Sequence, residues 1–511
     1  MPANADPSQH RHDYDRIDET ALASAYLQGQ DAGWDTLAKT DTSDTQRWLR
    51  ATVGAVGSSR SDGGTWFSLV EALLLLVEDN QATWPPRANE HEDAAILIAS
   101  LREAMADARS VWVGQEAAAL IIDALDRFLA EYSEEERPGM ALWAAQRLAH
   151  VIDEERQDTL SDWSAGQGRF VIEPRRAYPV ARLDPRTWLG GSANTRPQRL
   201  PSAVPGDAVH NVHIGNDLHH HYRLTLDWTL QGVLTGLSGL DDLRITTLHP
   251  DGTVDDFIIE PGPEAGTVVN RGPVDPDAHA EVLTALLRKA ADLEAHVVVL
   301  PEYAVPEATR TRLKEVLEEL PNAPMLVVAG STMTDEGFNE GSILVTAGDV
   351  CTSRAFRKVH RAEFQGQAEG IATDQPPSVT VWRAGDLALA VLLCRDAQDR
   401  RLMELLSDAG VNLLIVPSFT DRAESIIGVA ERLSTTTQAF VIVAIGPRRL
   451  ARSPGKATRE TEAFFRGPYG DDTRPPAVYA PDSEHADERG DGPGLWLFSS
   501  RGRHAEWHGL D

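Results

Sequence analysis

Asp386-Leu-Ala-Leu-Ala-Val-Leu-Leu-Cys394-Arg395-Asp396 is the stretch around which this chain is organised. Its almost unbroken apolar run predicts a strand that is buried on both faces and ends at Cys394. A helix is expected directly after it, and the N–H groups of a helix N-terminus favour a thiolate at this position. Free cysteines are also common in protein cores, so Cys394 is either a nucleophile or a packing residue.

The residues after this strand continue an alternation of helix and strand. Leu402, Leu405 and Leu406 share one helical face, and Gly410 is a stop signal. A second apolar run, from Val411 to Val416, is closed by Pro417 and Ser418 and predicts another buried strand. Strand, turn, helix and strand in this order are typical of an α/β fold.

The composition is that of a globular protein with a strongly acidic surface. The 511 residues include 48 basic and 78 acidic side chains, which gives a formal charge of -30. This charge repels nucleic acid and anionic membranes, so we expect neither as a partner. The chain has only two cysteines, Cys351 and Cys394, which excludes a disulfide framework and favours a cytoplasmic location.

The sequence divides into four parts. Residues 1–16 are polar and predict a disordered tail. Residues 17–165 carry helical periodicity and many tryptophans, which predicts an all-α domain. Residues 166–221 are rich in Pro, Arg and Gly and predict a linker. Residues 222–511 show strands and then alternating helices and strands, which predicts an α/β domain.

A histidine cluster in the linker is a weak candidate for a metal site. It comprises His210, His213, His219, His220 and His221. No cysteine accompanies these residues, and three successive histidines cannot all face one ion on a strand. Solvated surface histidines are therefore the favoured interpretation, and we expect no metal.

Three residues of suitable chemistry each follow a predicted strand: Glu302, Lys358 and Cys394. Side chains at the carboxyl ends of strands gather at one rim of an open α/β sheet. A carboxylate can take the thiol proton, the cysteine can attack a carbonyl carbon, and an ammonium can stabilise the oxyanion. Singly, Glu302 could cap a helix, Lys358 could be solvated and Cys394 could be packing, but jointly they favour catalysis.

Several motifs resemble the nitrilase, or carbon–nitrogen hydrolase, superfamily. They are Val297-Val-Val-Leu-Pro-Glu302, Phe356-Arg-Lys358-Val-His360, Leu392-Leu-Cys394-Arg-Asp396, Gly410-Val-Asn-Leu-Leu-Ile-Val-Pro417-Ser418 and Phe440-Val-Ile-Val-Ala444. They cover residues 275–446 well. The resemblance implies that residues 222–511 form a four-layer α-β-β-α sandwich that assembles into homodimers or larger homo-oligomers.

The resemblance also implies a mechanism without metal or organic cofactor. It makes Glu302 the base, Lys358 the oxyanion partner and Cys394 the nucleophile, and the backbone N–H of Arg395 a second oxyanion donor. Members of the family often carry a second glutamate after the lysine, for which Glu363 and Glu369 both qualify and the spacing favours Glu369. The implied substrates are small amides or nitriles, with amides favoured.

The sequence also departs from the family pattern. Ala397-Gln398-Asp399-Arg400 stands where an aromatic-proline pair is often found, and the helical first third has no counterpart in the usual single-domain enzyme. These departures leave a second reading open, in which the domain is a catalytically silent binding or assembly module.

Overall fold

The computed structural model describes most of the chain from residue 63 onwards. The described ranges are 63–79, 93–107, 115–180, 212–437, 439–447, 461–467, 477–480, 492–500 and 505–510, with a few positions at 46–53 and without 251, 349, 365, 386, 421 and 422. The predicted tail 1–16, most of residues 17–62 of the predicted all-α domain, and His210 lie outside the described residues.

The chain forms two compact units. The first comprises residues 1–166, 175–180 and 200–215, and the second comprises residues 167–174, 181–199 and 216–511. Residues that the sequence predicts to be a linker therefore contribute strands to both units.

The first unit is built on helices. Its helices are α4 (Gly63–Asp79), α5 (Asp93–Asp107), α6 (Gln115–Ala130), α7 (Arg137–Glu155) and α8 (Gln157–Gly166). A small antiparallel pair, β2 (Ala177–Pro179) and β3 (Val212–Ile214), adds Ala177 and Val212 to their core. Glu71 of α4 is buried and accepts hydrogen bonds from Arg176 and from the N–H of Ala177, which fixes β2 to α4.

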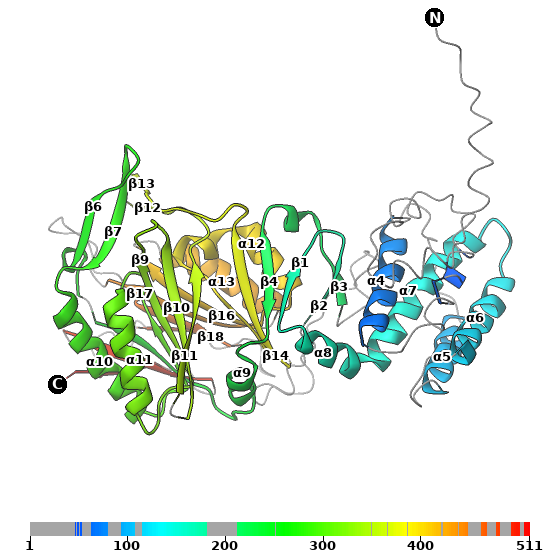
Figure 1. The fold of residues 1–511 in the computed structure, drawn as a ribbon, viewed down its shortest axis with the longest axis horizontal. Helices are drawn as coiled ribbons and strands as arrows, with labels where there is room; N and C mark the ends of the chain where they lie inside the picture. Colours follow the sequence, from blue (N-terminus) through cyan, green and yellow to red (C-terminus); the bar gives the residue numbers. More distant parts are fainter. Residues whose placement is uncertain are drawn as a thin grey trace, which may run out of the picture. The chain divides into compact units, whose positions relative to one another are not determined.

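The second unit contains two large mixed sheets (Figure 1). One has the order β1-β4-β14-β15-β16-β17-β18-β19 and the other has the order β11-β10-β9-β8-β5-β20-β21. The first sheet comprises β1 (Arg169–Ile172), β4 (Arg223–Asp227), β14 (Ser378–Ala384), β15 (Leu387–Val391), β16 (Leu413–Phe419), β17 (Phe440–Gly446), β18 (Ala463–Arg466) and β19 (Ala477–Ala480). The second comprises β5 (Arg244–His249), β8 (Val297–Leu300), β9 (Leu326–Met333), β10 (Asn339–Ala347), β11 (Val350–Arg357), β20 (Gly494–Ser499) and β21 (Glu506–Gly509).

The core of the second unit brings residues of both sheets into one cluster. Leu389 and Ile415 from the first sheet belong to the same buried cluster as Val297 and Val328 from the second. The other face of the second sheet packs on α10 (Pro276–Asp292) and α11 (Glu307–Glu319). The first sheet is followed by α12 (Arg400–Asp408) and α13 (Ala423–Thr437), and α9 (Gln231–Ser238) contributes Leu234 and Leu237 to the shared cluster.

The strands and helices predicted around Cys394 are confirmed, with one correction. All five residues of β15 are buried, and α12 places Leu402, Leu405 and Leu406 in the core. The prediction that Pro417 closes the next strand is wrong, because β16 continues to Phe419 and pairs with β17 along its whole length. Its other neighbour, β15, pairs only as far as Ile415, so the missing N–H of Pro417 costs no ladder hydrogen bond.

A small four-stranded sheet lies at one end of the large sheets (Figure 1). It consists of β6 (Phe257–Pro261), β7 (Thr267–Pro273), β12 (Glu363–Phe364) and β13 (Gln367–Glu369). The sequence predicts a short strand from Asp256 to Ile259, which corresponds to β6, but it predicts no strand at β7. Among the described helices, none is both long and apolar enough to cross a membrane.

Candidate active site

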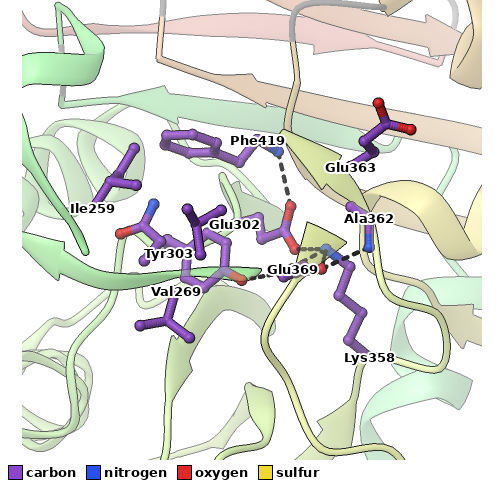
Figure 2. A pocket seen from close by; sticks show the side chains of 11 residues that line it. Ile259, Val269, Glu302, Tyr303, Lys358, Ala362, Glu363, Glu369 and Phe419 are labelled. Atoms are coloured by element: carbon purple, nitrogen blue, oxygen red, sulfur yellow. Dashed lines mark hydrogen bonds and ion pairs between the residues drawn. The ribbon is translucent and has the colours of Figure 1, made fainter. Parts of the chain in front are cut away.

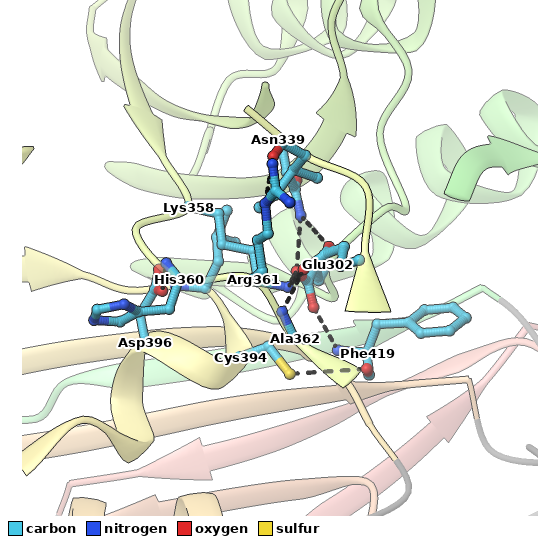
Figure 3. Close-up of polar contacts among 12 residues, drawn as sticks. Glu302, Asn339, Lys358, His360, Arg361, Ala362, Cys394, Asp396 and Phe419 are labelled. Carbon is cyan, nitrogen blue, oxygen red and sulfur yellow. Dashed lines mark hydrogen bonds and ion pairs between the residues drawn. The ribbon is translucent and has the colours of Figure 1, made fainter. Parts of the chain in front are cut away.

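Three strand ends bring the predicted site residues together (Figure 3). Glu302 follows β8, Lys358 follows β11, and Cys394 follows β15 after two further residues. Their exposed fractions are only 1%, 3% and 4%. Because β8 and β15 belong to different sheets, the site lies where the two sheets meet.

Lys358 bridges two carboxylates. Its Nζ lies 2.7 Å from Oε1 of Glu302 and 2.7 Å from Oε2 of Glu369. Burial alone would lower the pKa of Lys358, but the charges of Glu302 and Glu369 outweigh it and raise the pKa well above its usual value. Lys358 is therefore a fixed cation. Burial raises the pKa of Glu302, and the nearby ammonium of Lys358 opposes this rise.

Neutral groups also donate hydrogen bonds to the carboxylates of Glu302 and Glu369. Asn339 Nδ2 donates to Glu302 Oε1 at 2.8 Å and to Glu369 Oε1 at 3.4 Å. The hydroxyl of Tyr303 donates to Glu369 Oε1, and the N–H of Ala362 donates to Oε2 at 2.9 Å. Burial raises the pKa of Tyr303 well above its usual value, so this hydroxyl keeps its proton. These donors, together with Lys358, hold the two carboxylates in one geometry.

The main chain of Phe419 connects Cys394 with Glu302. Its N–H donates to Glu302 Oε2 at 3.0 Å, and its carbonyl oxygen accepts from Cys394 Sγ at 3.8 Å. Figure 3 shows both contacts meeting at Phe419. The last residue of β16 thus holds the thiol beside the carboxylate.

The thiol is protonated in this environment. Burial raises the pKa of Cys394 to about 12, and the negative charge of Glu302 adds to the rise. The expectation that a helix N-terminus favours the thiolate is wrong, because Cys394 begins only a short 3₁₀ turn, η7 (Cys394–Gln398). Attack by this sulfur therefore requires a base.

The backbone is strained on both sides of the site. Cys394 has φ of 46° and Tyr303 has φ of 65°, values that side chains with a Cβ rarely adopt. Such conformations are held only where the surrounding structure fixes them, and they cluster at active sites.

Asp396 holds the Lys358 loop against the Cys394 turn. Its Oδ2 accepts from the N–H of Val359 at 3.0 Å and of Leu393 at 3.3 Å, and its Oδ1 accepts from the N–H of His360 at 2.7 Å. Burial raises the pKa of Asp396 to about 7. Asp396 therefore positions both Lys358 and Cys394.

A cavity of about 40 Å³ opens onto this network (Figure 2). Its lining combines the site with the small sheet: Ile259, Val268, Val269, Asn270, Glu302, Tyr303, Lys358, Ala362, Glu363, Glu369 and Phe419. Cys394 is not among these lining residues. The cavity thus reaches the carboxylates and the ammonium directly, whereas Cys394 does not line it.

The structure separates the two candidates for the second glutamate. Glu369 contacts Lys358, whereas Glu363 is exposed at the cavity, and Figure 2 shows its carboxylate pointing away from Lys358. The side chain of Arg395 is exposed and donates to Gln398 at 2.5 Å.

The remaining sequence candidates lie elsewhere. Cys351 is buried in the core against α11, and burial raises its pKa to about 11. The described histidines of the cluster show no metal-binding group. The expectation that all of them are solvated is wrong for His219, which is buried and accepts from the N–H of Asn216.

Sequence reasoning missed Tyr303, Asn339 and Phe419, and it quoted Asp396 without a role. Tyr303 and Phe419 directly follow the quoted motifs, so their position was a usable signal. Asn339 begins β10, and the carboxylates that its side chain contacts, Glu302 and Glu369, are distant in the chain, so the sequence contains no sign of these contacts.

Comparisons with known proteins complete this description. No protein-family model matches the chain, and no curated protein matches it. Solved structures do match its C-terminal half. The C-terminal half resembles amidases of the nitrilase superfamily.

Three of the matching structures are from Nesterenkonia. An amidase from Nesterenkonia sp. has 17% identity and a TM-score of 0.33, with 50% of this chain and 89% of that chain covered. The NitN amidase has 18% identity and a TM-score of 0.33, with coverage of 50% and 91%. A cysteine mutant of the AN1 amidase has 16% identity and a TM-score of 0.35, with coverage of 50% and 90%.

Proposed function

We propose that this protein is a cysteine hydrolase that cleaves a non-peptide carbon–nitrogen bond, in an amide rather than a nitrile. Glu302, Lys358 and Cys394 are the proposed catalytic triad, with Glu369 as the second glutamate. The observation that carries the proposal is the buried Glu302–Lys358–Glu369 network, held through Phe419 beside a protonated thiol. A fully satisfied cluster of charges in a cavity is costly to bury and is typical of a catalytic site.

In the first half-reaction the thiol is acylated. Glu302 accepts the proton of Cys394, and the sulfur forms a bond to the amide carbonyl carbon. Lys358 Nζ and the backbone N–H of Arg395 stabilise the oxyanion. The carbon–nitrogen bond then breaks, Glu302 returns the proton to the nitrogen, and ammonia leaves a thioester on Cys394.

In the second half-reaction water releases the acid. Glu302 takes a proton from water, the hydroxyl oxygen bonds to the thioester carbon, and the carbon–sulfur bond breaks. The proton returns to the sulfur, so the enzyme regains its starting state. Glu369 keeps Lys358 charged throughout, since its carboxylate remains in contact with Nζ when Glu302 is protonated.

The resting thiol lies outside the cavity lining and donates to the carbonyl of Phe419. Acylation in the proposed mechanism begins when Sγ leaves this carbonyl and turns toward the substrate. The high pKa of Cys394 fits such a step, because the thiol loses its proton only as the new bond forms.

The proposal has a structural counterpart. We infer a four-layer α-β-β-α sandwich for the second unit, with α10 and α11 on one outer side and α12 and α13 on the other, preceded by a helical domain of about residues 17–165. The family resemblance further supports a homo-oligomeric enzyme without metal or organic cofactor, and the low cysteine count supports a cytoplasmic location.

One observation favours a second candidate, a catalytically silent relative that uses the sandwich for binding. It is that Cys394 is not among the residues that line the cavity. In that case the charged network would stabilise the fold and would bind ligands without covalent chemistry.

The decisive experiment combines turnover with trapping. The full chain is incubated with a panel of primary amides and nitriles, ammonia is measured, and Cys394 is examined for an acyl adduct by mass spectrometry after an acid quench. Ammonia release with an adduct on Cys394 supports the hydrolase. Absence of both, together with no labelling of Cys394 by iodoacetamide, would establish the silent module.

A further inference from the structure

Asn270 places an unused hydrogen-bond donor in the wall of the cavity. It lies on β7, lines the cavity, and is only 7% exposed. Its Nδ2 is buried and has no hydrogen-bond partner among the described residues. A buried amide donor without a partner is unfavourable unless something else compensates for it.

The orientation of this amide is fixed by its other end. Asn270 Oδ1 accepts from the N–H of Gly272 at 2.9 Å. Exchanging the oxygen and the nitrogen would set an NH₂ group against this N–H, so the nitrogen is the end of the amide that is left without a partner. Gly272 itself has φ of 96°, a backbone conformation that residues with a Cβ rarely adopt.

Contacts made by β6 and β7 hold the strand that carries Asn270 against the site. Phe257 of β6 packs edge-on against Phe419 with ring centroids 5.1 Å apart, and Tyr303 packs on the same ring at 5.8 Å. Glu369 of β13 pairs with Val268 of β7 in parallel register. The hairpin therefore cannot shift Asn270 without disturbing the second glutamate.

A second connection holds the turn of the hairpin. Both terminal nitrogens of Arg361 donate to Glu264, at 2.6 and 2.8 Å. Arg361 lies three residues after Lys358 in the loop that ends at Glu369. Asn270 is thus held at a defined position relative to the network, as a specificity residue must be.

We propose that Asn270 is a specificity-determining residue whose Nδ2 donates to an oxygen in the acyl part of the substrate. This inference rests on the proposed function and deepens it. Since Nδ2 can only donate, the matching substrate group is an acceptor. A site built to donate to a substrate oxygen discriminates against analogues that lack it, because the donor is then left unpaired.

The other lining residues define the rest of the substrate class. Ile259, Val268, Val269 and Phe419 make much of the wall apolar, and the cavity is small. Glu302, Glu363 and Glu369 contribute three carboxylates against the single ammonium of Lys358, which disfavours an anionic substrate. The substrate class is therefore a short, neutral primary amide with one ether, hydroxyl or keto oxygen in an otherwise apolar acyl chain.

The test compares isosteric amides that differ by one oxygen. The kcat/KM of the full chain is measured for methoxyacetamide against butyramide, for 3-methoxypropanamide against pentanamide, and for the anion succinamate. We expect one ether amide to exceed its aliphatic isostere by about tenfold, the effect of one hydrogen bond, and succinamate to be the poorest substrate.

Two variants remove the donor in different ways. Asn270→Leu removes both ends of the amide, and Asn270→Asp keeps an acceptor for Gly272. In both variants the kcat/KM of the preferred ether amide, divided by that of its aliphatic isostere, is expected to fall to within about threefold of unity. The kcat/KM for the ether amide should fall more than that for the isostere. Ile258→Ala, on the exposed side of the same hairpin, is the matched control and should keep the wild-type ratio.

Each outcome decides a different point. Equal turnover of the isosteres, or a preference unchanged in both Asn270 variants, overturns this inference and leaves the hydrolase standing. Turnover of none of these amides also overturns it, since the assigned substrate class is then wrong. The hydrolase is judged separately by the acyl adduct on Cys394 with the wider amide and nitrile panel.

Discussion

The backbone N–H of Phe419 donates a hydrogen bond to Oε2 of Glu302 across 3.0 Å. Through this bond the end of a strand in one sheet fixes a carboxylate at the end of a strand in the other. The carbonyl of the same residue accepts from Cys394 Sγ. The proposed base and nucleophile thus share one rigid peptide segment, and their relative position depends on how the two sheets pack.

The two cysteines should differ completely in function. Cys394→Ala is expected to lower kcat at least about a thousandfold, because it removes the proposed nucleophile. Cys351→Ala should keep most activity, since Cys351 is a core residue packed against α11. Ammonia release from the best amide of the panel measures both. Comparable losses in the two variants would mean that the nucleophile has been misassigned.

Lys358 should matter for stability as well as activity. Lys358→Met leaves Glu302 and Glu369 buried without their cation, and we expect the free energy of unfolding to fall by about 3–5 kcal/mol at neutral pH. Glu302→Gln should cost less, because Lys358 keeps Glu369 as its partner. Urea denaturation measures these differences, with Lys314→Met on α11 as the control. A Lys358→Met variant as stable as wild type would contradict the buried ion network.

Asp396 should make stability depend on pH. Its pKa is raised to about 7 in the folded protein, above its ordinary value of 3.8, so the folded state binds this proton more tightly. The contribution of Asp396 to stability is therefore fully present below about pH 4 and is lost as the pH rises through about 7.

The comparison with Asp396→Asn isolates this effect. The unfolding free energy of wild type minus that of the variant should fall by a few kcal/mol between pH 4 and pH 8. Chemical denaturation at several pH values provides the measurement. A difference that stays constant over this range, or rises, would show that burial of Asp396 does not favour its protonated form.

Gly330 should be essential to the position of Glu302. It has φ of +55°, and a Cβ there would lie 2.1 Å from the carbonyl oxygen of Pro301, the residue before Glu302. Gly330→Ala is expected to cost at least about 2 kcal/mol of stability and to reduce activity, because the end of β8 has to move. Thermal denaturation and turnover measure the two effects.

Gly348→Ala is a matched control for this substitution. Gly348 has φ of +65°, but a Cβ there would meet nothing within 4 Å. Gly348→Ala should therefore lower the free energy of unfolding by only about 1 kcal/mol, the conformational penalty alone, and leave activity intact. Equal destabilisation by the two substitutions would show that the contact with Pro301 is relieved without cost.

The sequence by itself determined the elements that carry the site. Runs such as Val297–Leu300 and Leu387–Val391 are apolar on both faces, and a run of this kind has no other stable place than the interior of a sheet. The polar residues at their ends, Glu302 and Cys394, were therefore identifiable because the apolar pattern stops there. The helical face of α12 was equally clear, since its leucines recur at helical spacing.

Only the tertiary structure decided how these ends meet. Glu363 lies on β12 and Glu369 on β13, and only the folding of this hairpin brings Glu369 rather than Glu363 against Lys358. The spacing of the two residues merely favoured Glu369. The protonation of Cys394 depends on burial and on the charge of Glu302, which outweigh the short turn that follows the cysteine. Neither quantity is encoded in neighbouring residues.

Asn270 and Phe419 show most clearly why the sequence alone could not predict the polar contacts of the site. Phe419 contacts a carboxylate that is distant in the chain. Asn270 lies on β7, which became a strand by pairing with β6 and β13 rather than by a strong pattern of its own. Local patterns report which face of an element is apolar. The pairing of buried polar groups is set by the packing of two sheets and a hairpin, because a buried donor or acceptor takes whatever partner the fold brings within reach.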